Sequence, residues 1–249
     1  MRRFLAFITV AMLFSGIKAQ ERTVENKPYI DLRPFHFGVL VGTHLQDMEL
    51  QNVGPQLITN EDGTTVEKLV TCDQDRWDAG FTVGVLGEVR LGNHFAFRVA
   101  PAMYFGTRHF TFLNHTDHLE DGTPITMQQE MKSAYISTAC DLIFSAKRFN
   151  NHRPYLMAGV NPMMNLSGSD DDIIRLKRFD CYLEIGMGCD FYLPFFKLRP
   201  ELKFGYSLTS ALDSKHAQEL KDKNMLLYTN AVKSDNSRTK FIALTFYFE

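Results

Sequence analysis

Apolar and polar residues alternate most regularly between Arg178 and Leu208. Because successive side chains of a β-strand point to opposite faces, this alternation predicts strands with one apolar wall and one polar wall. The apolar wall of the first half contains Phe179, Cys181, Leu183, Ile185, Met187, Cys189, Phe191 and Leu193. A turn around Pro194 leads into a second alternating segment, so the stretch predicts a long antiparallel hairpin.

The same period of two recurs along the chain. It predicts eight strands, over residues 35–45, 77–91, 95–112, 133–146, 153–166, 178–193, 197–208 and 238–248. These segments exceed the five or six residues usual in globular strands and match the alternating segments of about ten residues that build membrane barrels. We therefore predict an all-β fold, an eight-stranded antiparallel up-and-down transmembrane β-barrel.

The predicted connections fall into two classes. Three short turns (92–94, 147–152 and 194–196) alternate with four longer connections (46–76, 113–132, 167–177 and 210–236). Short periplasmic turns and longer external loops are typical of outer-membrane barrels. We expect the long connections to be polar loops facing outside, with a short helix possible over 217–227.

The N-terminal residues predict export of the chain. A secretory signal peptide needs a basic start, an apolar middle and a small residue before the cleavage site. These features are Arg2 and Arg3, the apolar run Phe4–Ile17, and Ala19. A run of about 14 residues is too short for an anchor helix. We divide the chain into a signal peptide (1–19), a short and loosely structured N-terminal lead (20–34) and an outer-membrane β-barrel (35–249).

Composition and charge restrict the partners. The chain is 45% hydrophobic and 22% charged and contains no run of about 18 apolar residues, so we expect no spanning helix. Removal of the signal peptide takes the formal net charge from −2 to about −5. An acidic chain argues against nucleic acid as a partner. We expect outer-membrane lipid around the barrel.

Charged residues gather on the walls that face the barrel interior. An eight-stranded barrel has an interior just wide enough for side chains, and buried charges are tolerated only when they are paired. We predict a network of paired charges made by Glu88, Arg90, Arg98, Asp180, Glu184, Asp190, Lys197, Arg199, Glu201 and Lys203. The same walls carry Asp78, Arg108 and Asp141. The alternative is an ion-conducting path along the axis.

The hairpin geometry predicts particular partners within this network. Counting back from the turn at Pro194, Asp190 should lie near Lys197 or Arg199, and Glu184 nearer to Lys203. Glycines at inward positions of the same strands should make room for long neighbouring side chains. These glycines are Gly186, Gly188 and Gly205.

No segment carries a recognisable catalytic, cofactor or metal motif. The chain has no G-x-S-x-G nucleophile motif, phosphate loop or dinucleotide fingerprint. His115–His118 and the acidic run 170–172 are interpreted as solvated loop residues. The four cysteines fit no zinc spacing, and we expect them to be small apolar residues, mostly on the outer wall, with Cys72 in a loop. We predict no enzyme activity, cofactor, metal or small-molecule substrate.

Several segments resemble the PorT family of outer-membrane β-barrels. They are residues 36–42, 84–92 followed by 97–101, 153–159 and, the most specific, Asp190–Lys203, which reads Asp-Phe-Tyr-Leu-Pro-Phe-Phe-Lys-Leu-Arg-Pro-Glu-Leu-Lys. One departure occurs at Ala139–Leu142, where such proteins usually have an acidic-Leu-Pro-Leu pattern. The resemblance implies a barrel of Bacteroidota that is required for the type IX secretion system, which exports proteins with a conserved C-terminal domain.

The resemblance and the filled interior together suggest a role in secretion without catalysis. A cargo chain has no room to pass through an eight-stranded barrel packed with side chains. We therefore expect the protein to support export or maturation of the cargo by contacts with other type IX components. The alternative is a stand-alone outer-membrane barrel with a structural or lipid-modifying role.

Overall fold

The computed structural model describes residues 24–59, 63–168, 172–220 and 225–249. Eight long strands form the main body of the protein. They are β1 (Phe35–Glu49), β5 (Asp78–Arg90), β6 (Phe95–His118), β7 (Pro124–Ser145), β8 (His152–Asn165), β9 (Phe179–Tyr192), β10 (Lys197–Ser207) and β11 (Arg238–Phe248). The expected signal peptide lies outside the described residues.

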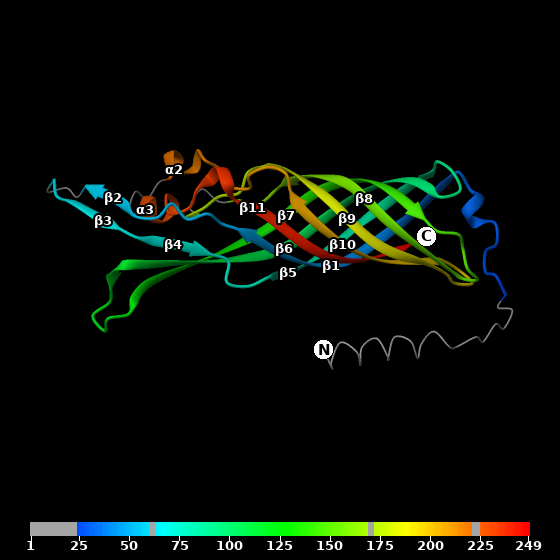
Figure 1. Cartoon of the computed structure of the whole chain (residues 1–249), viewed down its shortest axis with the longest axis horizontal. Coiled ribbons are helices and arrows are strands. Elements are labelled where there is room, and N and C mark those ends of the chain that lie inside the picture. Colours follow the sequence, from blue (N-terminus) through cyan, green and yellow to red (C-terminus); the bar gives the residue numbers. More distant parts are fainter. Residues whose placement is uncertain (1–23, 60–62, 169–171, 221–224) are drawn as a thin grey trace, which may run out of the picture.

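The eight strands close into an antiparallel ring (Figure 1). Each long strand pairs with the next along the chain, and β1 closes the ring by pairing with β11. This closing pairing runs from Val39 opposite Phe248 to Glu49 opposite Arg238. The prediction of an eight-stranded up-and-down β-barrel is therefore confirmed.

The hairpin of β6 and β7 extends well beyond the ring. Its pairing continues as far as His118 opposite Pro124, so most of the connection predicted over 113–132 is strand, and that prediction was wrong. The strands continue because their inward side chains still have a core to pack into beyond the ring. Phe112 and Met131, for example, are buried there. Figure 1 shows this hairpin, in green, reaching past the barrel at the end opposite the chain's C-terminus.

The connection predicted over 46–76 also contains regular structure. Strand β1 itself continues to Glu49, and β2 (Gln56–Thr59) forms a hairpin with β3 (Thr65–Lys68). Strand β4 (Val70–Asp73) pairs with β6 beyond the point where β5 begins. A long polar loop was therefore too simple a prediction for this connection.

The described part of the last connection contains three short helical segments. They are α2 (His216–Glu219), α3 (Leu226–Thr229) and η3 (Ser234–Asn236), and the first two fall on or beside the helix expected over 217–227. Residues 221–224 between them are outside the described part of the chain. Among the described residues, no helix is long and apolar enough to cross a membrane.

Apolar side chains from these connections pack into one core, which we call the cap. Its main members are Met48, Val70, Cys72, Phe110, Phe112, Met131, Ile174, Leu176, Leu212, Tyr228 and Val232. Phe112 and Tyr228 pack edge to face, with ring centroids 6.0 Å apart. Cys72 belongs to β4 and is buried, whereas the other three cysteines are partly exposed at outward strand positions. The long connections thus close one end of the barrel.

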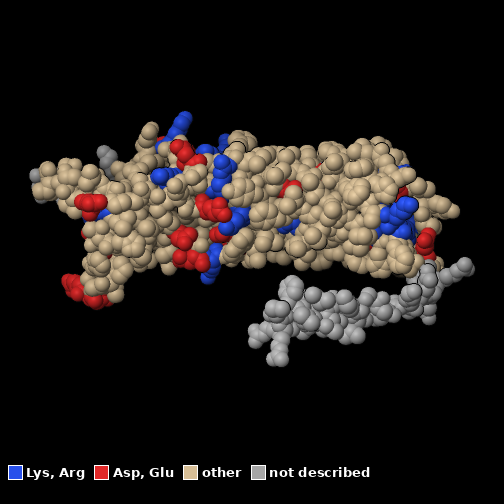
Figure 2. Space-filling view, in the orientation of Figure 1, with Lys and Arg blue, Asp and Glu red and all other residues tan. Residues whose placement is uncertain are grey.

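The outer wall of the ring is apolar. Exposed side chains on it include Phe37, Phe81, Phe144, Leu156, Ile185, Met187 and Leu202. On β7 the outward positions change from Leu142 and Ile136 within the ring to Lys132, Glu130 and Gln128 on the extension. Figure 2 shows charged side chains gathered toward the two ends, with few on the wall between them. Such an apolar band is typical of a barrel that faces lipid.

Candidate functional site

The interior of the barrel holds most of the charges that the sequence pattern assigns to it. Successive side chains of a strand point to opposite faces. Because the residues before and after each of these charges are apolar and face outward, the charged side chains face the interior. Arg98, Glu184 and Glu201 have no exposed surface, and Lys197 and Arg199 have 1% exposed. Charges buried to this extent need partners, and they find them across the barrel in two layers.

The first layer surrounds Arg199, near the short-turn end. Its Nε lies 2.6 Å from Asp190 Oδ1, and its Nη1 lies 2.5 Å from Glu88 Oε2. The same Nη1 lies 2.6 Å from Glu249 Oε1. Glu249 also pairs with Lys197, whose Nζ is 2.5 Å from Oε2. Arg199 thus joins three carboxylates that come from three different strand ends.

The second layer surrounds Arg98, further along the axis. Its Nη2 lies 3.0 Å from Asp141 Oδ2 and 2.7 Å from Glu201 Oε2. Glu201 accepts two further hydrogen bonds, from the hydroxyls of Tyr155 and Tyr247, each at 2.9 Å. The guanidinium of Arg98 also stacks on the Tyr247 ring, 4.4 Å from its centroid. Charge-assisted bonds of this kind fix the positions of all five side chains.

A separate pair extends the second layer toward the cap. Lys203 Nζ lies 3.0 Å from Glu184 Oε2, and Asn161 donates to the other oxygen of Glu184 at 2.5 Å. The partners inferred from the hairpin register, Asp190 with Arg199 and Glu184 with Lys203, are therefore neighbours in the structure.

Glycine makes room for the rings beside these charges. A Cβ at Gly188 would lie 2.4 Å from the hydroxyl of Tyr155, and a Cβ at Gly205 would lie 2.3 Å from the Phe241 ring. A Cβ at Gly186 would lie 2.9 Å from the Lys203 side chain. The close packing therefore depends on the inward glycines of β9 and β10.

Two of the ten residues predicted for the network lie elsewhere. Arg90 is the last residue of β5, and its guanidinium donates to the carbonyl oxygen of Leu32 and to Asn93. Asp180, near the start of β9, accepts hydrogen bonds from Ser207 and Thr209. Both occupy strand ends, where side chains reach the rim instead of the centre of the barrel.

The structure also adds residues that the predicted network left out. Glu249 is the main omission, because it pairs with both Lys197 and Arg199. Its position follows the alternation of β11, in which Tyr247 points inward and Phe248 outward, so the pattern contained the signal. Asp141 had been placed on the inner wall but not in the network. Tyr155 is uncharged, so a prediction based on charged residues did not include it.

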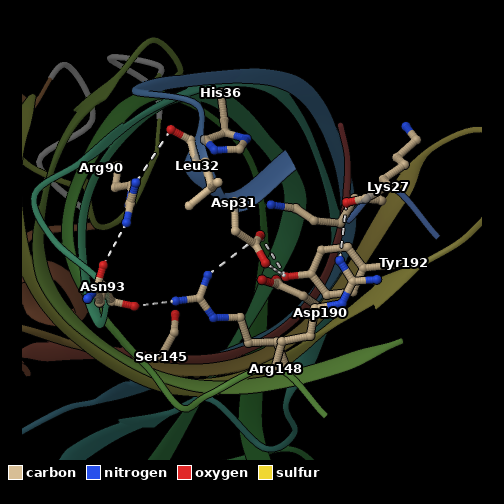
Figure 3. A network of polar contacts seen from close by, with 12 residues as sticks. Lys27, Asp31, Leu32, His36, Arg90, Asn93, Ser145, Arg148, Asp190 and Tyr192 are labelled. Carbon is tan, nitrogen blue, oxygen red and sulfur yellow. Dashed lines mark hydrogen bonds and ion pairs between the residues drawn. The ribbon is translucent and has the colours of Figure 1, made fainter. Parts of the chain in front are cut away.

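The short-turn end of the barrel is closed by residues 24–34, which we call the N-terminal strap (Figure 3). Arg148, from the turn after β7, donates to the carbonyl oxygens of Asn26 at 2.5 Å and Lys27 at 3.2 Å. Its guanidinium lies 3.7 Å from the centroid of the Tyr192 ring. These contacts replace the loosely structured lead expected from the prolines in this segment.

Asp31 holds the middle of the strap, in the short helical turn η1 (Ile30–Leu32). The hydroxyl of Tyr192 lies 2.8 Å from each of its carboxylate oxygens, and Arg153 Nη1 lies 3.5 Å from Oδ1. Arg153 also donates to the carbonyl oxygen of Asn93 at 2.8 Å, which connects the strap to the turn after β5. A cavity of about 20 Å³ lies beneath the strap, beside Glu88 and Lys197.

The histidine-rich segment 115–118 is part of the hairpin extension. His115 Nε2 lies 2.9 Å from the hydroxyl of Thr71, and Asp117 pairs with Lys68 at 2.7 Å. Hydrogen bonds from Lys68 and Asn114 lower the pKa of Asp117. Within the described residues, no group of three or more histidine, cysteine or acidic side chains is arranged to hold a metal ion. Asp170 and Asp171 are outside that part of the chain.

Comparison with known proteins identifies the type of domain. The family model described as "Outer membrane protein beta-barrel domain" matches residues 18–213. None of the curated proteins matches the chain.

Three solved structures are similar to this chain at low sequence identity. Neisserial surface protein A is 13% identical and has a TM-score of 0.43, covering 86% of this chain and 98% of its own. OprG from Pseudomonas aeruginosa is 12% identical, with a TM-score of 0.42 and coverages of 85% and 91%. Ail of Yersinia pestis, solved with the heparin analogue sucrose octasulfate, is 13% identical, with a TM-score of 0.38 and coverages of 87% and 99%.

Proposed function

The chain belongs to the outer membrane protein beta-barrel domain family, and on this premise we propose that it is a closed, non-enzymatic barrel that acts by protein contacts. One observation carries the proposal: the interior is filled by paired charges and aromatic rings. The cavities beside Glu88 and beside Arg108 have volumes of about 20 and 10 Å³. A cavity of this size holds about one water molecule, so neither a cargo chain nor a sugar has a path through it.

Closure of both ends supports the same proposal. The cap covers one mouth with apolar side chains, and the N-terminal strap covers the other, held by hydrogen bonds from Arg148, Arg90 and Tyr192. A barrel that is closed throughout presents only its outer wall, its cap and its turns to other molecules. This closure supports a function that resides in contacts made by these surfaces.

We propose that these contacts serve the type IX secretion system. The support is the resemblance of the mature chain to PorT-like barrels, above all the segment Asp190–Lys203. This segment contributes Asp190, Lys197, Arg199, Glu201 and Lys203 to the two charge layers. A related barrel would need the same residues to fill its interior, which gives the resemblance a physical reason.

Deletion of the gene, followed by an assay of culture supernatant, tests this role. We expect the proteins with the type IX C-terminal domain to remain in the cell and to keep their unprocessed length. Undiminished export would contradict the secretion role and favour a stand-alone structural or lipid-modifying barrel. If export is lost, complementation of the deletion with a strap variant such as Arg148→Ala shows whether the short-turn end takes part.

Site-specific cross-linking in intact cells identifies the contact surface. A photoreactive residue on the turn at Phe195, which is 90% exposed, samples the short-turn side. One at Gln128 on the β7 extension samples the cap side, and one at Met187 samples the wall. We expect cross-links to other secretion components from at least one of these positions. Adducts with lipid alone at all three would contradict action by protein contacts.

A further inference from the structure

One buried cation stands outside the two charge layers. Arg108, on β6 just below the cap, is 2% exposed. Among the described residues, no carboxylate oxygen lies within 4.0 Å of its guanidinium. The acid that acts on it from further away is Asp180, whose oxygens accept hydrogen bonds from Ser207 and Thr209. Arg108 therefore differs from Arg98 and Arg199, which each pair with two or three acids.

The side chains that hydrogen-bond to Arg108 are neutral, and they include the hydroxyls of Tyr135 and Tyr182. Arg108 Nη1 donates to Thr239 Oγ1 at 3.2 Å, and its guanidinium carbon lies 5.8 Å from the centroid of the Tyr135 ring. Its Nε is fully buried and has no acceptor among the described residues. A buried donor on a charged group without an acceptor is strongly unfavourable, so a further partner is expected there.

A small cavity adjoins this guanidinium. Its volume is about 10 Å³, and its polar lining includes Arg108, Gln46, Tyr135, Tyr182 and Thr239. No acidic residue lines it. The lining therefore offers one positive charge and several hydroxyl or amide donors, which is the complement of an anion.

We propose that this cavity is a halide site that holds one chloride ion against Arg108. The ion would supply the acceptor that Nε lacks and the negative charge that the surroundings of Arg108 lack. Phosphate and sulfate are too large for a space of about one water molecule. Chloride is only slightly larger than water, and the flexible thioether of Met163 on the cavity wall can yield to it.

The proposal is independent of the role in secretion and predicts a measurable linkage. A ligand that binds only the folded barrel stabilises it in proportion to the logarithm of its concentration. The purified wild-type barrel in detergent should therefore unfold at a higher temperature in sodium chloride than in sodium gluconate of equal ionic strength. The difference should grow as chloride replaces gluconate.

Arg108→Gln removes the charge and should abolish this chloride dependence, while Arg90→Gln, the same change at the rim, should keep it. If Arg108→Gln does not fold, crystals of the wild-type barrel grown in sodium bromide provide the second measurement. An anomalous bromide peak beside Arg108 Nε supports the site. Equal unfolding temperatures of the wild type in the two salts, or a crystal with only water at this position, would overturn the proposal.

Discussion

At the residue scale, the interior charges depend on one another because no water replaces a missing partner. Lys203 and Glu184 illustrate this point, since both are almost fully buried and lie 3.0 Å apart. Loss of one partner leaves the other as an uncompensated charge, whereas loss of both removes the problem together with the bond.

Glu184→Gln should therefore destabilise the barrel by about 3–5 kcal/mol, because Lys203 keeps its charge without a counter-charge. The double variant Glu184→Gln with Lys203→Met should recover part of this loss. The temperature at which the folded band disappears in a gel-shift assay measures both effects. A double variant that is no more stable than the single variant would show that the pair is not an isolated unit.

The outer wall gives a prediction of the opposite kind, in which a charge is introduced into lipid. Ile185 lies in the middle of β9 and is 56% exposed at an outward position. Ile185→Arg should cost about 2–4 kcal/mol if this position is near the bilayer midplane. Gln128→Arg, at an outward position of the β7 extension, is the control and should be neutral. Equal stability of the two variants in lipid vesicles would show that β9 does not face lipid.

At the element scale, the N-terminal strap is held by side chains and not by strand pairing. Arg148 donates hydrogen bonds to the carbonyl oxygens of Asn26 and Lys27, and its guanidinium packs on the ring of Tyr192, which itself donates to Asp31 of the strap. An element fixed in this way should detach without unfolding the ring.

Arg148→Ala should accordingly increase hydrogen exchange of residues 24–33 while the strands of the ring keep their protection. The matched control is Lys27→Ala, because Arg148 binds the backbone of Lys27 and not its side chain. Hydrogen exchange followed by mass spectrometry measures both variants. Unchanged protection of the strap in Arg148→Ala would mean that other contacts hold it.

At the scale of the whole molecule, a barrel closed at both ends and filled between them should not conduct. In planar lipid bilayers, we expect the wild type to show little or no steady conductance. Arg199 and Arg98 each span the interior to reach acids on other strands, so the layers also block the axis. A stable, large conductance would contradict the closed barrel and show that the protein forms a pore.

Orientation in the membrane is a further property of the whole molecule. We expect the cap outside the cell and the short turns in the periplasm. In a background without native cysteines, Glu120→Cys at the hairpin tip should react with an impermeant maleimide on whole cells, and Asn93→Cys should not. Labelling of Asn93→Cys before the cells are lysed would show that the barrel has the opposite orientation.

The sequence by itself determined the ring. Alternation with a period of two fixes which side chains face inward, and the long strands such as Phe179–Tyr192 carry it without interruption. Register within a hairpin follows from its turn, and this is why Glu184 and Lys203 could be paired in advance. Local pattern is sufficient here because strand alternation is a property of neighbouring residues.

Only the tertiary structure decided what closes the two ends. The cap brings together Phe112 of β6, Tyr228 of α3 and Val70 of β4, and no local period links them. The strap docks through Arg148 and Tyr192, which are distant from it in sequence but adjacent in the ring. The layers around Arg98 and Arg199 likewise join strands that face each other across the barrel. Such contacts depend on the curvature and closure of the sheet, which no single stretch of sequence contains.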